Sequence, residues 1–181
     1  MNADSHGLDT PSVWVVRWAD RALAGGRLLD VACGSGRHAR YFAARGHPVV
    51  AVDRDPATPE RLAGVPRVTA RCADLEQGNW PFHGEQFAGI VVTNYLHRPL
   101  FPHLLAALAP AGVLIYETFA AGNERFGRPS NPAFLLRPGE LLEAVQGALR
   151  VLAYEDVFVT DPKPAMIQRI CAVNATAVDC T

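Results

Sequence analysis

Strand-like apolar runs that alternate with helix-like stretches constrain the fold of this 181-residue chain more than any other feature. The runs expected as strands lie at 27–33, 48–53, 66–72, 87–93 and 112–118. The stretches expected as helices lie at 37–45, 57–63, 100–109 and 139–149. Strands that are mostly apolar along their length and alternate with helices predict a parallel sheet covered on both faces.

The end of the chain breaks this alternation. Two strand-like runs, at 150–160 and from residue 166 onward, are separated only by the residues DPKPA. This connection is too short for a crossover helix, so the pair must form an antiparallel hairpin. We therefore expect an α/β fold with a seven-stranded, mostly parallel sheet that ends in an antiparallel hairpin.

The rest of the chain fits one domain over residues 1–181. Residues 11–24 have apolar side chains at helical spacing, so residues 1–26 are expected to form a helical prelude to the core. The segment 120–138 is long and contains glycine, proline, charged and aromatic residues. It follows a strand at the edge where open α/β sheets bind ligands, and we expect it to form a substrate lid.

Composition argues against several functions. The formal net charge of −1 gives no sign of a nucleic-acid binder, and Lys163 is the only lysine, which excludes a phosphate-binding loop that needs a lysine after its glycines. The polar first residues and the lack of an apolar run of roughly 18 to 20 residues predict a cytoplasmic protein without a membrane segment. The cysteines have no paired metal spacing, so we expect free thiols and no metal site. They are Cys33, Cys72, Cys171 and Cys180.

The stretch DVACGSGRHA, residues 30–39, lies between the first strand and the first helix of the alternation. Its glycines fit a dinucleotide-binding loop of the type Gly34-x-Gly36-x-x-Ala39, with Asp53 at a suitable distance to hold a ribose. Glycines at such a turn serve any ligand that must touch the backbone, so they do not choose the cofactor.

Three acidic residues after successive strands favour S-adenosylmethionine (SAM) over a dinucleotide. Asp30 would repel a pyrophosphate but attract the ammonium and sulfonium groups of SAM, and a buried carboxylate at this strand end has no other evident structural reason. Asp53 can accept hydrogen bonds from both ribose hydroxyls, which by itself fits either cofactor. Asp74 and Leu75 offer an acid for the adenine amino group and an apolar wall for its ring.

These residues resemble the motifs of class I SAM-dependent methyltransferases. The resemblance runs from Asp30 to Gly36, through Asp53 and Asp74, to GIVVTNYLHRP at 89–99, and includes the terminal hairpin. It implies a Rossmann-like three-layer sandwich. Within the class, the chain resembles small bacterial methyltransferases related to tellurite resistance. Ala32 departs from the class, which usually has glycine there, and this exchange should leave cofactor binding intact.

The resemblance assigns SAM as the cofactor and places the site at the carboxyl ends of the strands. The residues expected to bind SAM are Asp30, Ala32, Cys33, Gly34, Gly36, Arg37, Asp53, Arg54, Asp74, Leu75, Asn94 and Tyr95. The residues expected to take part in catalysis are Tyr95, His97 and Glu117. The side chain of His97 could act as a base or could cap the helix that begins near Pro99. The sulfonium already activates the methyl group, so a base is not required.

The acceptor is not determined by any motif. The resemblance implies a small molecule such as a thiol or an oxyanion of tellurium or selenium, with Arg98, Arg125 and Arg128 able to steer an anion. RNA or protein methylation, a catalytically silent SAM-binding partner and an NAD-dependent oxidoreductase are the alternatives. Either a monomer or a homodimer fits the sequence.

Overall fold

A computed structural model, which describes residues 10–175, contains a seven-stranded sheet with the strand order β3-β2-β1-β4-β5-β7-β6. The strands are β1 (Leu28–Val31), β2 (Val49–Asp53), β3 (Val68–Cys72), β4 (Phe87–Thr93), β5 (Leu108–Phe119), β6 (Arg150–Val159) and β7 (Ala165–Val173). The pairs from β3 to β5 are parallel, and β7 pairs antiparallel with both β5 and β6. The predicted fold class, terminal hairpin included, is confirmed.

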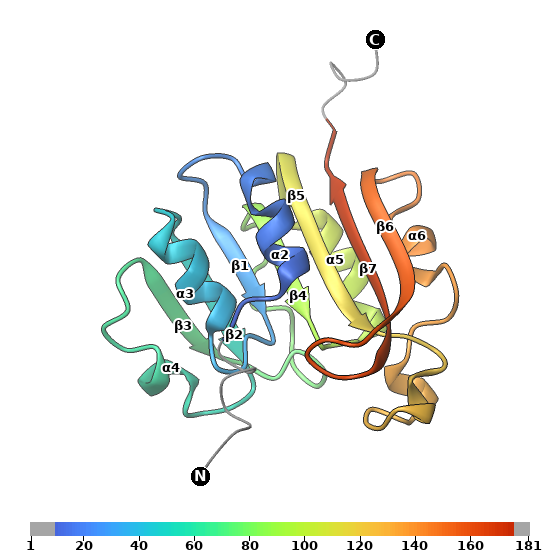
Figure 1. Ribbon diagram of the computed structural model, residues 1–181. Coiled ribbons are helices and arrows are strands. Elements are labelled where there is room, and N and C mark those ends of the chain that lie inside the picture. The colour runs from blue at the N-terminus through green and yellow to red at the C-terminus, as the bar shows by residue number, and fades with distance from the viewer. Residues whose placement is uncertain (1–9, 176–181) are drawn as a thin grey trace.

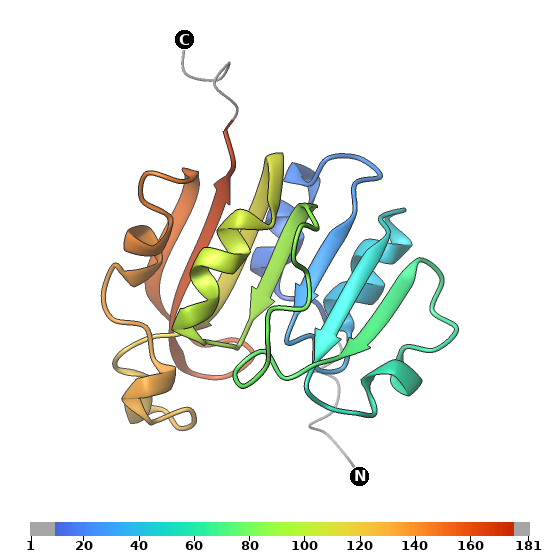
Figure 2. The ribbon, with the colours of Figure 1, turned by 180° about the vertical axis from the view of Figure 1, so that it is seen from behind.

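Helices cover both faces of this sheet, which makes three layers (Figure 1). The helices are α2 (Val13–Trp18), α3 (Arg37–Ala44), α4 (Thr58–Arg61), α5 (Phe101–Ala106) and α6 (Glu140–Val145). Helices α2 and α3 lie on one face, and Figure 2 shows α5 and α6 on the other. The short 3-10 helices are η1 (Ala19–Arg21), η2 (Arg98–Leu100), η3 (Asn123–Arg125) and η4 (Pro132–Phe134).

Two hydrophobic cores explain why the central strands are apolar along their whole length. Leu28 of β1 packs in the core beneath α2 and α3, whereas its neighbour Leu29 packs in the core beneath α5 and α6. Successive side chains of a strand point to opposite faces, so a strand covered on both sides must be apolar at every position. The two cores thereby hold the sheet rigid, and the candidate functional site lies at the carboxyl ends of its strands.

The segment 120–138 is folded against the body of the protein. The side chain of Asn123, which is 2% exposed, donates to Pro129 O at 2.9 Å and accepts from Met166 N at 3.2 Å. Farther along, Gln168 of β7 donates to Arg137 O at 2.6 Å. Buried amides that satisfy backbone groups in this way fix a segment in place.

Among residues 10–175, no helix has the length and apolar character needed to cross a membrane. Cys33, Cys72 and Cys171 are free thiols. Cys180 and the first nine residues of the prelude lie outside the described residues.

Candidate functional site

The loop between β1 and α3 turns through three left-handed residues. The φ angles are 51° at Ala32, 55° at Gly34 and 79° at Gly36. The φ angle of Gly36 favours glycine, and a Cβ atom there would lie 2.4 Å from Leu62 Cδ2, so the Leu62 side chain would have to move. Ala32 keeps a side chain in a conformation that disfavours one.

Asp30 lies beneath this loop and is 2% exposed. Its Oδ2 atom accepts a hydrogen bond from Ala39 N, in the first turn of α3, at 3.0 Å. The N-cap of α3 is Gly36, which has no side chain to cap the helix, so Asp30 performs this role from the neighbouring strand. Burial raises the pKa of Asp30 to about 7, against the opposing effects of the Ala39 N–H group and Arg37. The expectation that its burial lacks a structural reason is therefore wrong.

A first hollow of about 210 Å³ lies at the carboxyl ends of β1 to β4. The residues that line it are Ala32, Asp53, Arg54, Ala73, Asp74, Leu75, Glu76 and Tyr95. Backbone N–H groups hold the two expected acids in place: Asp53 Oδ2 accepts from Gly34 N of the glycine loop at 2.8 Å, and Asp74 Oδ1 accepts from Glu76 N, in a local turn, at 2.8 Å. Six of the residues that were expected to bind the cofactor therefore line this one hollow.

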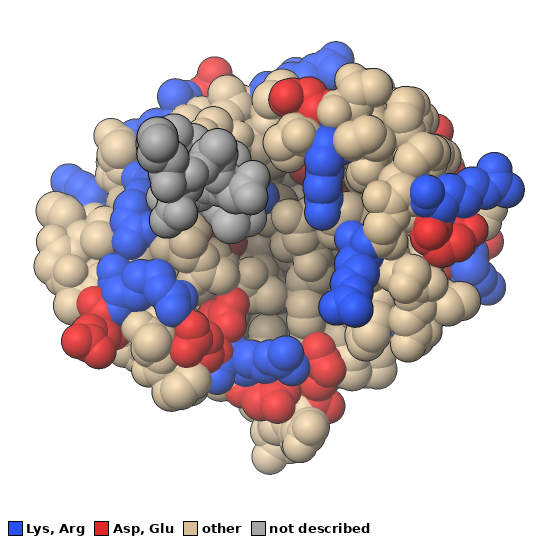
Figure 3. Space-filling model, turned by 60° about the horizontal axis from the view of Figure 1, so that its bottom comes forward, with Lys and Arg blue, Asp and Glu red and all other residues tan. Residues whose placement is uncertain are grey.

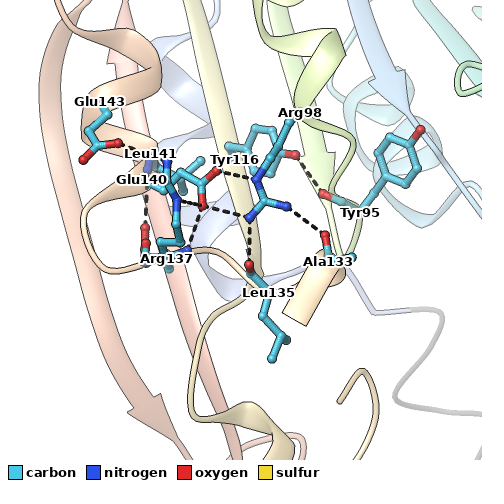
Figure 4. Close-up of polar contacts among 10 residues, drawn as sticks. Tyr95, Arg98, Tyr116, Ala133, Leu135, Arg137, Glu140, Leu141 and Glu143 are labelled. Atoms are coloured by element: carbon cyan, nitrogen blue, oxygen red, sulfur yellow. Dashed lines mark hydrogen bonds and ion pairs between the residues drawn. The ribbon is translucent and has the colours of Figure 1, made fainter. Parts of the chain in front are cut away.

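Tyr95 forms one wall of the first hollow. Burial, and next the nearby carboxylate of Glu76, raise the pKa of the Tyr95 hydroxyl above its ordinary value, so this group stays protonated at neutral pH. The backbone oxygen of Tyr95 accepts from the Tyr116 hydroxyl at 2.8 Å, which fixes the turn after β4 (Figure 4). An aromatic ring, apolar walls and carboxylates together suit a nucleoside, whereas the carboxylates would repel a pyrophosphate.

A second hollow has a volume of about 410 Å³. Figure 3 shows that the centre of this face of the molecule is hollowed. Asn94 lines the second hollow and the adjacent Tyr95 lines the first, so the two meet at the turn after β4. The walls of the second hollow come from the segment 10–13, from Arg37 of α3, from the end of β5 and from the hairpin between β6 and β7. None of residues 120–138 lines either hollow.

Glu117 enters the second hollow from β5. Its side chain accepts from Ser12 Oγ at 2.7 Å and pairs with Arg169 at 3.3 Å. Arg169 also binds Glu155 at 2.8 Å, so each charge in this group has a partner. Arg37, on the opposite wall, donates to Thr10 O at 3.2 Å, and its partial burial lowers its pKa.

Four residues expected to act in catalysis or to steer an anion line neither hollow. His97 lines neither hollow, and its side chain makes no cap hydrogen bond to the 3-10 helix η2, so the capping alternative is wrong. Arg98 binds Glu140 at 2.6 Å and donates to Ala133 O at 2.8 Å and Leu135 O at 2.9 Å (Figure 4). Its guanidinium therefore ties the segment before α6 to the body and lines neither hollow, where it could contact an anionic substrate. Arg125 and Arg128 line neither hollow.

Sequence reasoning missed several residues of the second hollow. Ser12 donates its backbone N–H to His38 Nε2 at 3.1 Å, and burial keeps His38 neutral by lowering its pKa to about 3. Phe119, Lys163 and Ile167 line the hollow because β7 lies between β5 and β6. The short DPKPA connection was the one available signal, because it implied a hairpin at the same edge of the sheet as the glycine loop.

Comparisons with known proteins agree with this geometry. A family model described as "Methyltransferase domain" matches residues 28–112. No curated protein is similar enough to count as a match. A TehB-like SAM-dependent methyltransferase from Corynebacterium glutamicum has a TM-score of 0.65 at 21% identity, with 89% of this chain and 87% of that chain covered.

Two further solved structures share the fold. TehB from Haemophilus influenzae has a TM-score of 0.69 at 16% identity, with 96% of this chain and 63% of that chain covered. The glycopeptide N-methyltransferase MtfA, complexed with S-adenosylhomocysteine, has a TM-score of 0.62 at 18% identity, with 88% of each chain covered.

The family match covers the glycine loop and the three strand-end acids, and the fold extends the likeness over most of the chain. The family model describes a methyltransferase domain, and the dinucleotide alternative is not supported. Residues 28–112 therefore match a methyltransferase domain, and the chain has the fold of solved SAM-dependent methyltransferases.

Proposed function

We propose that the protein transfers the methyl group of SAM to a small-molecule acceptor that binds in the second hollow. The observation that carries this proposal is the pair of adjoining hollows, which meet at Asn94 and Tyr95. Pockets for small ligands usually span roughly 300 to 1,000 Å³. The second hollow, at about 410 Å³, has room for a small acceptor beside the end of the cofactor.

The first hollow is the proposed site of the adenosine part of SAM. Asp53 would bind the ribose hydroxyls, and Asp74 and Leu75 would hold the adenine ring. Arg54 and Tyr95 would complete the walls, because both line this hollow. Ala32, Cys33, Gly34 and Gly36 would form the loop beneath the methionine part, with Asp30 holding that loop to α3.

The methionine carboxylate of SAM is the proposed partner of Arg37. The guanidinium of Arg37 lies in the second hollow at the start of α3, directly after the glycine loop. Asn94, whose backbone N–H donates to Glu117 O at 2.9 Å, would separate the cofactor from the acceptor. A positive φ of 55° holds Asn94 in that tight turn.

Bound SAM supplies a methyl group that its sulfonium already activates. The residues of the chain would then orient the acceptor for in-line attack and exclude water. Tyr95 stays protonated and Glu117 is held in an ion pair, so neither is free to remove a proton readily. The proposed role of Tyr95 and Glu117 is therefore to position the reactants, and a base role for His97 stays a prediction. An acceptor that is nucleophilic without a base, such as a thiolate or a selenium or tellurium oxyanion, suits this arrangement.

The experiment that tests the function measures formation of S-adenosylhomocysteine from SAM with three groups of acceptors. These are small thiols, selenite and tellurite, and a mixture of RNA and protein. We expect turnover with a member of the first two groups and none with the third, and we expect Asp53→Ala to lose most of it. Turnover with RNA or protein alone would overturn the small-molecule proposal.

A further inference from the structure

The charges around the second hollow are unevenly matched. Three basic and two acidic side chains line it. Arg169 is paired with Glu117 and Glu155, but Arg37 and Lys163 have no ion-pair partner among residues 10–175. Asp161 lies on the same turn as Lys163, and no ion pair joins them. Two cations are thus available to a ligand.

The wall beneath Lys163 is apolar. Phe119 of β5 and Ile167 of β7 are directly opposite each other in the antiparallel pair, and Ala165 is opposite Val159 in the next pair. All four side chains line the second hollow. Cross-strand neighbours on one face form a continuous surface, so the outer half of the hollow offers an apolar strip.

Lys163 lies beside Phe119, at one end of this apolar strip. It belongs to the hairpin between β6 and β7, which passes beneath the carboxyl end of β5 (Figure 1). Its Nζ atom lies 5.8 Å from the centre of the Phe119 ring. This contact with an aromatic face keeps the ammonium beside the apolar strip, and an exposed contact of this kind is weak enough to yield to an anion.

We infer that the acceptor is an organic molecule with an acidic group, whose acidic group binds Lys163 and whose apolar body packs against Phe119 and Ile167. This inference rests on the proposed function, since it concerns the acceptor of the same reaction. Arg37 is not assigned to the acceptor, because it adjoins the glycine loop and is the proposed partner of the methionine carboxylate of SAM. A bare oxyanion would satisfy a cation but would leave the apolar strip without a partner.

The test is a binding titration of the full chain, saturated with S-adenosylhomocysteine, with two probes of the same shape. The probes are 3-phenylpropionate and its neutral amide, 3-phenylpropionamide. We expect the carboxylate to bind about tenfold more tightly, since a hydrogen bond to a charged group contributes more than one between neutral groups. Lys163→Gln should remove this difference, and Lys163→Arg should retain it.

Matched variants show whether the effect belongs to the hollow. Arg150→Gln removes one exposed positive charge from the far end of β6 and should leave both affinities unchanged. Asp161→Asn should leave or strengthen carboxylate binding. Equal affinities of the two probes, no binding of either, or stronger binding of selenite would overturn the inference. Because binding needs no turnover, such a result is distinct from a failure of methyl transfer.

Discussion

The carboxyl group of Asp30, beneath the glycine loop, makes the stability of the folded protein depend on pH. Its pKa rises from 3.8 to about 7 on folding, mainly because burial disfavours the charged form. The folded state therefore holds this proton more tightly than the unfolded chain. Between about pH 4 and pH 7, the unfolded chain binds fewer protons at this position, and the contribution of Asp30 to stability falls as pH rises.

Asp30→Asn should stabilise the protein at pH 8. An asparagine oxygen can still accept from Ala39 N, and the variant has no charge to desolvate. We expect a gain of about 1 to 3 kcal/mol in unfolding free energy at pH 8 and little change at pH 4, measured by urea denaturation. His38, whose pKa falls to about 3, is present in both proteins, so its pH effect cancels in the difference. An equal gain at both pH values would contradict this account.

Ala32→Gly is the second prediction at a single residue. Ala32 has a φ of 51°, where a Cβ atom costs roughly 1 kcal/mol, so glycine should raise the unfolding free energy by about 0.5 to 1 kcal/mol. Ala39→Gly, inside α3, is the matched control and should lower it by about 1 kcal/mol or more. Urea denaturation of both variants measures the effects. A loss of stability at Ala32 would mean that the loop adopts another conformation.

At the level of elements, the ion pair between Arg98 and Glu140 joins η2 to α6. The side chain of Glu140 is 6% exposed, and it also accepts from Arg137 N at 2.7 Å. The hydrogen bonds to Arg98 and the backbone of Arg137 outweigh the effect of burial and lower the pKa of Glu140. Loss of Arg98 would leave a buried carboxylate without its main partner.

Arg98→Met should cost about 2 to 3 kcal/mol of unfolding free energy, less than for a fully buried pair because Arg98 is partly exposed. It should also speed proteolysis within residues 125–134, since the backbone oxygens of Ala133 and Leu135 lose their donor. The double variant Arg98→Met with Glu140→Gln should recover part of the loss. If the double variant is less stable than the sum of the single effects, charge burial is not the cause.

The sequence predicts the existence of these elements better than their ends. Strand β4 (Phe87–Thr93) has the predicted bounds, because an apolar run limited by polar residues defines it. The predicted helix at 100–109 instead ends at Ala106, and β5 begins at Leu108, because pairing between Leu108 and Phe87 extends the sheet. Helix ends depend on such tertiary contacts, which periodicity does not contain.

At the scale of the whole molecule, sequence order and spatial order differ where the second hollow forms. The acids Asp53 and Asp74 could be placed because consecutive parallel strands end at one edge of the sheet. Lys163 and Ser12 could not, because β7 inserts between β5 and β6 and the start of α2 crosses the face of β5. Residues far apart in the chain thus complete the site through topology.

SAM binding should stabilise the whole fold, because the proposed site draws on the glycine loop and on the ends of four strands. A ligand at about 100 times its dissociation constant adds roughly 2.7 kcal/mol to the unfolding free energy. For a chain of this size, that corresponds to a rise in Tm of about 5 to 10 °C. We expect this rise with SAM and S-adenosylhomocysteine but not with NAD or NADP, in a thermal-shift assay.

Asp53→Ala should lose most of this rise in Tm, whereas Asp156→Ala, on β6 away from both hollows, should keep it. An equal rise with NAD would mean that the carboxylates at the strand ends do not exclude a pyrophosphate, and the assignment of the first hollow to adenosine of SAM would then fail.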